Sequence, residues 1–573
     1  MASTAIAPGV TVLRSYQRKW LSKDVVAGLV LTALLVPQGM AYAELAGLPS
    51  VTGLYTSVTC LVAYAIFGPS RVLVLGPDSS LGPMIAATIL PLVGANGSPE
   101  RAIALASMLA LIVGLLTILA GVGRLGFVAD LLSRPTRIGY LNGLALTIVV
   151  GQLPKLFGFS VDAKGVIREA AKFVEGVAHG DTVPAALTVG LFSLALILGC
   201  QRWLPRVPGV LVAVVAAILA VVTFDLGAHG VDLVGTLPQG FPTPAFPSVP
   251  FSDLGRLLAG AVGIAIVSLA DTISTSSAFA ARKGRDVDAN KEMIAIGSAN
   301  IAAGLFHGFA VSTSGSRTAV ADQSGAQTQV TGLVGAAMIT LMLLFVPGLL
   351  RNLPQPTLAA IVIAASFSLT DIPGTLRLRR QRPTEFWLSI AAFLGVALLG
   401  VLAGIGIAVG LSIMNVFRHA WWPYNAELGR VEGLAGYHDV QMHPEAKRIP
   451  GLVIYRWDGP LFFANARSFR NEIRELAASD PPPRWILVAA EPITDVDVTA
   501  ADMLRELDRT LDAAGITLYF AEMKDPVRQK VERYELTDAI PLAHFFPTLG
   551  AAVRAYRDAH PAPRHAPERV SDD

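Results

Sequence analysis

The sequence has few charged side chains and only two cysteines. Asp, Glu, Lys and Arg make up 15% of its 573 residues, whereas soluble proteins carry about 25%. Hydrophobic residues account for 53%, and the mean hydropathy is +0.55. This balance points to a membrane protein. Cys60 and Cys200 lie inside apolar runs, which indicates small core residues and excludes a disulfide framework or a cysteine metal site.

Several features of enzymes are also missing. The sequence shows no constellation of His, Ser and a carboxylate and no phosphate-binding loop. We therefore expect no enzyme, no cofactor and no nucleic-acid partner. The N-terminus has no signal-peptide cleavage site, and residues 1–23 form a basic lead-in to an apolar segment too long for a signal peptide.

Long apolar segments fill most of the chain. A membrane-spanning helix needs about 20 mostly apolar residues. That requirement predicts fourteen spans near residues 24–46, 51–68, 75–93, 101–121, 135–152, 182–200, 207–224, 253–279, 290–309, 312–325, 327–347, 355–371, 384–399 and 400–418.

The basic residues fall mainly in alternate connections between these spans. They are Arg71, Arg124, Arg134, Arg137, Arg202, Arg206, Arg282, Lys283, Arg285, Arg377, Arg379, Arg380 and Arg382. Cytoplasmic loops carry the excess of Lys and Arg, so this pattern predicts two cytoplasmic termini in an inner (cytoplasmic) membrane. The 153–181 loop, which is also basic, is the exception.

A Pro- and Gly-rich loop at 224–252 divides the spans into seven and seven. A repeat with an odd number of spans inserts its second copy upside down, which predicts an inverted repeat. The third span of each half is interrupted by polar residues, and such paired interruptions are the best sequence indication of a transport site. We therefore expect both interruptions to line one cavity.

The second interruption reads AVSTSGSRTAVAD, residues 310–322. Non-helical backbone at membrane depth must be satisfied by protein or by a water-filled cavity. The start of a helix offers free N–H groups that favour an anion, and the hydroxyls and Arg317 suit the same ligand. Alternatively, Arg317 forms a salt bridge to Asp78 or Asp271. The candidate residues here are Ser314, Gly315, Ser316 and Arg317.

The first interruption reads LGPDSSLGPM, residues 75–84. Ser79 and Ser80 are candidate anion ligands. Asp78 would repel an anion unless it is protonated or paired, so we interpret it as a candidate proton carrier.

Other polar residues lie inside apolar spans. Asp271 and Thr275 share one helix face and suit a sodium ion or a proton relay, since intramembrane carboxylates usually mark ion pathways. Asp271 as a structural aspartate is the alternative. Gln38, which follows Pro37, has an amide suited to an anion or to an interhelical hydrogen bond, and Tyr42 lies one turn further on the same face.

The composition changes after residue 418. Residues 419–436 are predicted to form a linker, and 437–560 a small α/β domain with strands near 452–459, 485–490 and 517–522. Residues 561–573 are a polar tail that we expect to be disordered.

The segment PSVTGLYTSVTCLVAYAIFGPSR, residues 49–71, resembles the signature of the SulP family of inorganic anion transporters, with Pro69 replacing the usual small residue. VPQGMAYAELAGLP, LGPDSS and SGSRTAV are also similar to family segments. The resemblance implies a polytopic α-helical fold of seven plus seven spans, with core and gate domains formed by 24–418 (repeats 24–224 and 253–418), and a C-terminal STAS domain.

The resemblance also implies roles for residues. The anion site would use Gln38, the helix start at Asp78 to Ser80, and Ser314 to Arg317. Asp271 and Thr275 match a sodium site of bicarbonate-transporting members, but Asp78 departs from the small or hydroxyl residue frequent there. Thr499 stands where related domains carry a phosphorylatable serine. As the alternative, it caps its helix.

These observations predict secondary active transport of a small inorganic anion, sulfate or bicarbonate, coupled to H⁺ or Na⁺, by a homodimer in the lipid bilayer. An uncoupled anion channel, an exchanger and a C4-dicarboxylate carrier are the alternatives. Asp78 and Asp271 disfavour a channel, because conduction alone does not need them. A nucleobase carrier is disfavoured by Arg317, since a neutral ring needs no counter-charge.

Overall fold

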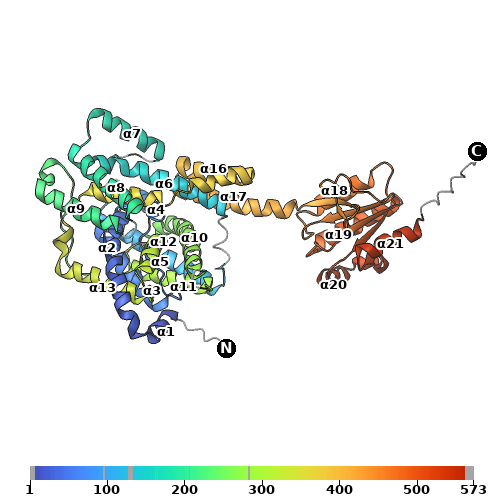
Figure 1. The fold of residues 1–573 in the computed structure, drawn as a ribbon, viewed down its shortest axis with the longest axis horizontal. Helices are drawn as coiled ribbons and strands as arrows, with labels where there is room; N and C mark the ends of the chain where they lie inside the picture. The colour runs from blue at the N-terminus through green and yellow to red at the C-terminus, as the bar shows by residue number, and fades with distance from the viewer. Residues whose placement is uncertain are drawn as a thin grey trace, which may run out of the picture. The chain divides into compact units, whose positions relative to one another are not determined.

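The computed structural model describes residues 7–94, 97–126, 133–161, 163, 165–204, 207–281, 284 and 286–561. The basic residues Arg206, Arg282, Lys283 and Arg285 and the tail from 562 to 573 lie outside the described residues. The chain divides into two units, Met1–Ser412 and Ile413–Asp573, which are considered separately (Figure 1).

The first unit is a bundle of helices, and all fourteen predicted apolar segments contain one. The first half holds α2 (Leu21–Leu45), α3 (Ser50–Phe67), α4 (Gly82–Val93), α5 (Pro99–Val122), α6 (Arg134–Phe157), α8 (Pro184–Trp203) and α9 (Gly209–Phe224). The second half holds α10 (Phe251–Ala281), α11 (Ala289–Leu305), α12 (Gly315–Gln323), α13 (Val330–Phe345), α14 (Gln355–Phe367), α16 (Pro383–Leu399) and α17 (Val401–Trp421).

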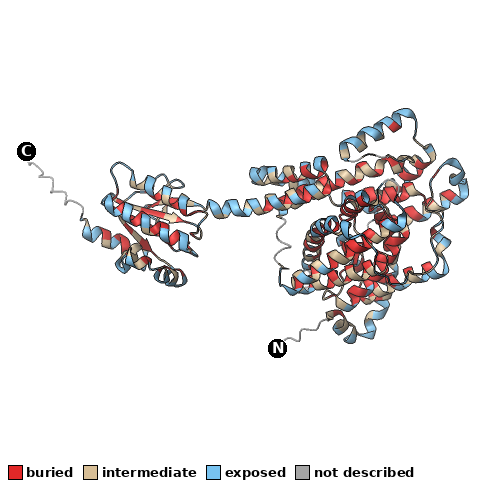
Figure 2. Cartoon of the chain, turned by 180° about the vertical axis from the view of Figure 1, so that it is seen from behind, coloured by how far each residue is buried: buried red, intermediate tan, exposed pale blue. Residues whose placement is uncertain are grey.

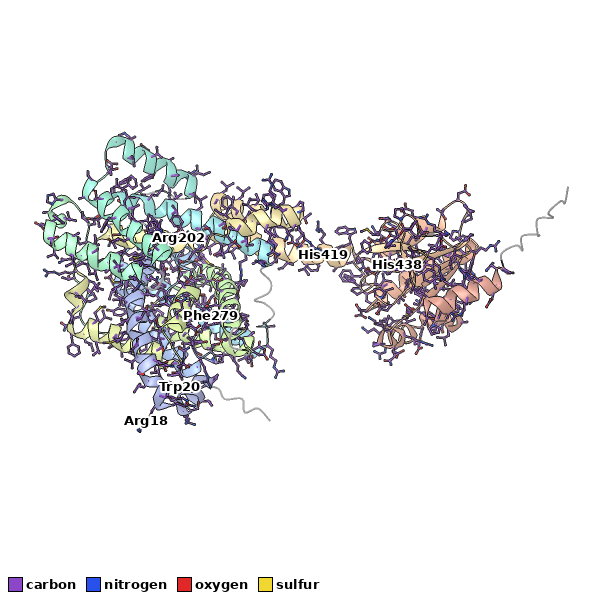
Figure 3. All side chains as sticks on the ribbon, viewed as in Figure 1. Arg18, Trp20, Arg202, Phe279, His419 and His438 are labelled. Carbon is purple, nitrogen blue, oxygen red and sulfur yellow. The ribbon has the colours of Figure 1, made fainter. Side chains whose placement is uncertain are left out.

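Short elements accompany these helices. They are α1 (Pro8–Arg14), η1 (Arg18–Trp20), β1 (Leu75–Gly76), α7 (Val166–His179), η3 (Leu226–His229), β2 (Ser312–Thr313), η4 (Pro347–Leu350) and α15 (Ile372–Gln381). Within the described residues, seven helices are long and apolar enough to cross a membrane by length and composition, and four shorter helices are apolar. Figure 3 shows Arg18 and Trp20 together at the end of the bundle beside α1, where a basic and aromatic lead-in suits a membrane interface.

Helix packing repeats between the two halves. In one group, α5 packs on α10 and α11, and its counterpart α13 packs on α2 and α3. In the other group, α6 packs on α16, and its counterpart α14 packs on α8. In each group, a helix of the first half packs on helices of the second half, and its counterpart in the second half packs on the equivalent helices of the first. An inverted repeat requires this symmetry. The first group (α2–α5 and α10–α13) is the core domain, and the second (α6, α8, α9, α14, α16 and α17) is the gate domain.

The second unit contains a six-stranded sheet in the order β4-β3-β5-β6-β7-β8. Its strands are β3 (Asn425–Gly429), β4 (His438–Asp439), β5 (Leu452–Trp457), β6 (Trp485–Ala489), β7 (Thr517–Ala521) and β8 (Phe545–Phe546). Strands β5 to β8 are parallel, and β3 is antiparallel to β4 and β5. The three predicted strands are confirmed as β5, β6 and β7.

Helices cover both faces of this sheet. Phe469 of α18 (Ala466–Ala477), Leu504 of α19 (Val498–Ala513) and Val527 of α20 (Asp525–Arg533) share one buried cluster. Val553 of α21 (Leu549–Ala559) belongs to a second cluster on the other face. Short turns η5 (Leu536–Asp538) and η6 (Leu542–His544) connect α20 to β8. Figure 2 shows the strands buried between these layers, and shows α7 of the first unit mostly exposed.

The close crossing of α2 and α3 gives a stability prediction. A Cβ added at Gly53 would lie 1.9 Å from the carbonyl oxygen of Gly39, so Gly53→Ala should force the helices apart. We expect a loss of about 3 kcal/mol or more, at the upper end for overpacked cores, seen as a lower melting temperature of the purified protein. Gly410→Ala is the control, because nothing lies within 4 Å of that position. Equal melting temperatures would contradict the prediction.

Candidate anion-binding site

The two interrupted segments meet as a two-stranded antiparallel ladder. Strand β1 pairs with β2, with Leu75 opposite Thr313 and Gly76 opposite Ser312. The N–H of Ser314 donates to the carbonyl of Val74 at 3.1 Å, which extends the ladder. Helices α4 and α12 begin just beyond the strands. The segments that the sequence places in equivalent positions of the two halves are therefore joined, although the sequence did not predict their strands.

Side chains of neighbouring helices hold the second strand in place. The amide of Asn300, on α11, accepts from the N–H of Val311 at 2.9 Å and donates to its carbonyl at 3.3 Å. The hydroxyl of Ser268, on α10, donates to the same carbonyl at 3.0 Å. These bonds satisfy backbone groups that no longer have helical partners. Sequence reasoning missed Asn300, although a lone amide in an apolar segment was a usable signal.

Arg317 lies fully buried beside β1. Its Nη2 donates to the carbonyl of Pro77 at 2.6 Å, while Nε and Nη1 have no hydrogen-bond partner. A Cβ at Gly76 would come within 2.7 Å of Nη1, so glycine leaves room for the guanidinium. The salt bridge from Arg317 to Asp78 or Asp271 is absent among the described residues, and that interpretation is wrong. Within the described residues the buried guanidinium therefore has no carboxylate as an ion-pair partner.

The start of α12 is open at its first turn. Ser314 is the N-cap, and its hydroxyl accepts from the N–H of Arg317 at 3.5 Å and lies 3.1 Å from the hydroxyl of Ser316. Gly315 and Ser316 are exposed. A Cβ at Gly315 would lie 4.0 Å from Cγ2 of Thr275, which places Thr275 beside this helix start.

The carboxylates Asp78 and Asp271 are linked through Ser80. The Ser80 hydroxyl lies 2.7 Å from Oδ1 of Asp78 and 3.3 Å from Oδ2 of Asp271, and the Ser80 N–H donates to Asp78 at 2.9 Å. The expectation that a helix starts at Asp78 to Ser80 is wrong, because these residues form a turn and α4 begins at Gly82. The turn forms because the Asp78 side chain binds the backbone two residues ahead.

Helix α2 supplies the remaining candidates. Tyr42 is buried and its hydroxyl interacts with Ser79. Gln38 is partly buried and makes no hydrogen bond within the described part of the chain, so the interhelical bond is not seen there. Tyr42 of α2, the β1–α4 turn, Asp271 and Thr275 of α10 and the β2–α12 junction are thus brought together beside the ladder, in an arrangement suited to a small anion, whereas no contact joins Gln38 to them in the described chain.

Two further buried carboxylates of the first unit escaped the sequence reasoning. Glu292, on α11, accepts from the hydroxyls of Tyr64, at 2.7 Å, and Ser70. Asp24, on α2, accepts from the N–H groups of Gln327 and Thr328 before α13. Each carboxylate connects two helices of the core domain. Each also directly follows another charged residue in the sequence, so the pair resembled the polar end of a membrane span.

A separate cavity of about 980 Å³ opens between core and gate domains. Its lining includes Glu44 of α2, Lys155 of α6 and Gln355 of α14. A Glu44 oxygen accepts from the Gln355 amide at 3.0 Å, and the other lies 3.9 Å from Nζ of Lys155. None of the candidate anion ligands lines this cavity, so it is distinct from the ladder site, and we call it the vestibule.

In the second unit, the N-cap of α19 is Asp497, whose carboxylate accepts from the N–H of Ala500 at 2.8 Å. The interpretation of Thr499 as the helix cap is therefore wrong. Thr499 is the second residue of α19 and is exposed. A carboxylate side chain one position before the helix occupies the capping role instead.

The helical unit is thus a polytopic membrane transporter of the seven-plus-seven inverted-repeat class, with core and gate domains and two short helices, α4 and α12, that begin just beyond the paired strands. Residues 21–392 match the model of the Sulfate permease family, and residues 443–552 match the STAS domain. The chain belongs to the sulfate permease (SulP) family and carries a C-terminal STAS domain, and its family role is anion transport.

Relatives by sequence support this family assignment, and solved structures support the fold. A probable sulfate transporter of Mycobacterium tuberculosis is 43% identical over 97% of this chain and 99% of its own length. Probable sulfate transporter 3.3 of Arabidopsis thaliana is 29% identical over 93% and 87%. The structure of murine Solute Carrier 26 family member A9, an anion transporter in the inward-facing state, superposes with a TM-score of 0.88 at 23% identity, covering 96% and 94%. The transmembrane domain of a cyanobacterial bicarbonate transporter gives 0.61 at 23%, covering 69% and 99%.

Proposed function

We propose that the protein is a secondary active transporter of a small inorganic anion, sulfate or bicarbonate, coupled to H⁺ or Na⁺. The observation that carries the proposal is the buried guanidinium of Arg317, which has two free nitrogens and no carboxylate partner in the described chain. An uncompensated buried charge is costly. An anion bound at the ladder would supply the missing counter-charge, and the α12 start would add N–H groups.

The proposed ligands are Gln38, Tyr42, Ser79, Ser80 and the residues Ser314 to Arg317. Sulfate is the cargo after which the relatives are named, and bicarbonate is the cargo after which one structural neighbour is named. The proposed setting is a homodimer in the cytoplasmic membrane, with both termini in the cytoplasm.

Asp78 and Asp271 are the proposed coupling groups, with Thr275 completing the alternative sodium site. Ser80 joins the two carboxylates, so a proton or cation bound at one would change the charge facing the anion. An uncoupled channel would not need this pair of carboxylates, so the pair favours a coupled transporter over a channel.

Uptake of labelled anions into proteoliposomes tests the proposal. Sulfate and bicarbonate are each offered under a pH gradient alone, a sodium gradient alone, and neither. We expect accumulation of one anion above equilibrium under one gradient. Equilibration without accumulation under both gradients would indicate a channel or an exchanger, and uptake of only C4-dicarboxylates would indicate the organic-anion carrier.

Alternating access requires contacts between core and gate to open and close, and Glu44 tests this. Glu44→Lys would set two cations face to face at the vestibule. The Lys155 side chain is partly exposed, so solvent screens the repulsion, and we expect the contact to be weakened by about 1 kcal/mol. The uptake rate should fall by roughly fivefold. The reversed pair Glu44→Lys with Lys155→Glu should recover most of the rate.

Lys172→Glu is the control, because the ion pair of Lys172 within the described residues is with Glu175 on the exposed helix α7. A double variant no faster than Glu44→Lys would show that the Glu44–Lys155 contact does not set the transport rate.

A further inference from the structure

One helix of the gate domain, α6, faces the carboxylates Asp78 and Asp271 of the core domain. Tyr140 of α6 is buried, and its hydroxyl donates to Sδ of Met84, on α4 of the core domain, at 3.4 Å. The charges of Asp271 and Asp78 both act on this hydroxyl. Side chains three residues apart share one face of a helix, so Arg137 stands one turn before Tyr140 on the same face of α6. The core-facing side of this gate helix therefore carries an arginine.

Arg137 acts on the core domain through its charge. It is partly buried, and its guanidinium makes no hydrogen bond and no ion pair within the described residues. Its charge nevertheless acts on Asp271, which also faces the charge of Asp78 and lies 3.3 Å from the Ser80 hydroxyl. Arg137 and Asp271 therefore attract each other across the boundary between gate and core without a bonded contact.

The fixed charges around the empty site balance when Arg137 is included. The core domain contributes the cation Arg317 and the carboxylates Asp78 and Asp271, a net charge of −1 when both carboxylates are ionised. Arg137 of the gate domain brings this net charge to zero. An unbalanced charge inside a protein is costly, so a core domain that has moved away from Arg137 attracts one positive charge from solution. A coupling cation, H⁺ or Na⁺, has the required charge.

Alternating access moves one group of helices against the other. Arg137 belongs to the gate domain and Asp271 to the core domain, so the distance between their charges differs between the two access states. When the guanidinium is near, it repels a cation at Asp271 and balances the carboxylate itself. When the guanidinium is distant, the carboxylate attracts the cation.

We propose that Arg137 is the release group for the coupling cation, because its guanidinium replaces the cation as the counter-charge of Asp271 in one access state. Arg137 lies in the first turn of α6, at the proposed cytoplasmic end of that helix, so the cation is released into the cytoplasm. The inference rests on the proposed function, since it requires a coupled cation.

Transport by the full-length protein in proteoliposomes tests the release role in two modes. Gradient-driven accumulation of labelled sulfate, or of labelled bicarbonate where that is the anion accumulated, requires cation release in every cycle. Exchange of labelled for unlabelled anion, with equal cation concentrations on both sides, does not. In Arg137→Gln we expect accumulation to fall by about tenfold, because one nearby charge changes the cation affinity of a partly buried site by this order. Exchange should continue, and the cation concentration that gives half-maximal uptake should fall.

Two further variants serve as matched controls. Arg137→Lys keeps the positive charge and should restore most of the accumulation. Arg134→Gln removes an exposed arginine one turn earlier on the same helix, where solvent and salt screen the charge, and should leave both modes unchanged. Loss of packing alone would slow both modes and would not lower the cation concentration needed for uptake.

Three results would overturn the proposal: equal loss of accumulation and exchange in Arg137→Gln, unchanged accumulation in that variant, or the same selective loss in Arg134→Gln. The proposed function is judged separately, in the unmodified protein. Absence of any gradient response there would overturn both the proposed function and the release role. A normal gradient response that persists in Arg137→Gln would overturn the release role alone.

Discussion

Replacing Arg317 with alanine should reduce anion affinity by about 100-fold and bring uptake to the background level. The guanidinium is the buried positive charge at the ladder, and hydrogen bonds to charged groups contribute about 1.5–3 kcal/mol each. Arg317→Lys should keep part of the affinity, because a point charge replaces a planar fork that binds through two nitrogens. Binding of labelled sulfate and bicarbonate to the purified variants measures the effect.

Arg351→Ala provides the control for net charge, since Arg351 is exposed after η4. The Arg317→Lys protein also checks folding, because it keeps the buried cation and should elute as a single species. Unchanged affinity in Arg317→Ala would remove Arg317 from the site and, with it, the main support for the proposed function.

Asp271→Asn should abolish the response of uptake to the coupling gradient while leaving anion binding intact. If sodium is the coupling ion, the variant loses sodium stimulation because the carboxylate ligand is gone. If protons are coupled, a neutral Asp78–Asp271 pair tolerates the anion and a charged pair repels it. Uptake by the unmodified protein should then rise as external pH falls, and Asp271→Asn or Asp78→Asn should flatten that dependence.

The measurement is initial uptake at constant membrane potential, with an inward proton gradient and an inward sodium gradient imposed separately. Thr272→Val is a matched control on α10, because in the described part of the chain the Thr272 hydroxyl binds only the carbonyl of Ser268 one turn back. A full gradient response in Asp271→Asn would move the coupling group elsewhere, with buried Glu292 the next carboxylate to test.

The sequence predicted the membrane unit better than its site. Apolar length located a helix in each of the fourteen predicted segments, because hydropathy is a local property. The ladder could not be found that way, since β1 and β2 have two residues each and no periodicity. Their pairing depends on contacts between distant segments, as does the fit of Gly76 around Arg317.

Other errors have local causes. Helix α7 was missed because its charges made residues 153–181 read as a loop, although its pattern is amphipathic. Strands β3, β4 and β8 and helix α21 were missed because they lie outside the strongest alternation of apolar residues. The cap of α19 was misassigned by two positions, since Asp497 and Thr499 are both good capping residues and only geometry distinguishes them.

The ladder also has a consequence for the biogenesis of the protein. Arg317 and its partner Pro77 are 240 residues apart, and a ribosome needs on the order of ten to fifty seconds to make that length. During this interval the backbone of Leu75 and Gly76 has no strand to pair with, at a depth where unpaired groups are costly. Until the second half is made, the first half lies in the membrane without the β1–β2 ladder. Water, lipid headgroups or an insertion factor must then satisfy its unpaired backbone groups. Assembly of the centre can begin only once residues 312–317 have been made, while the rest of the chain is still being synthesised.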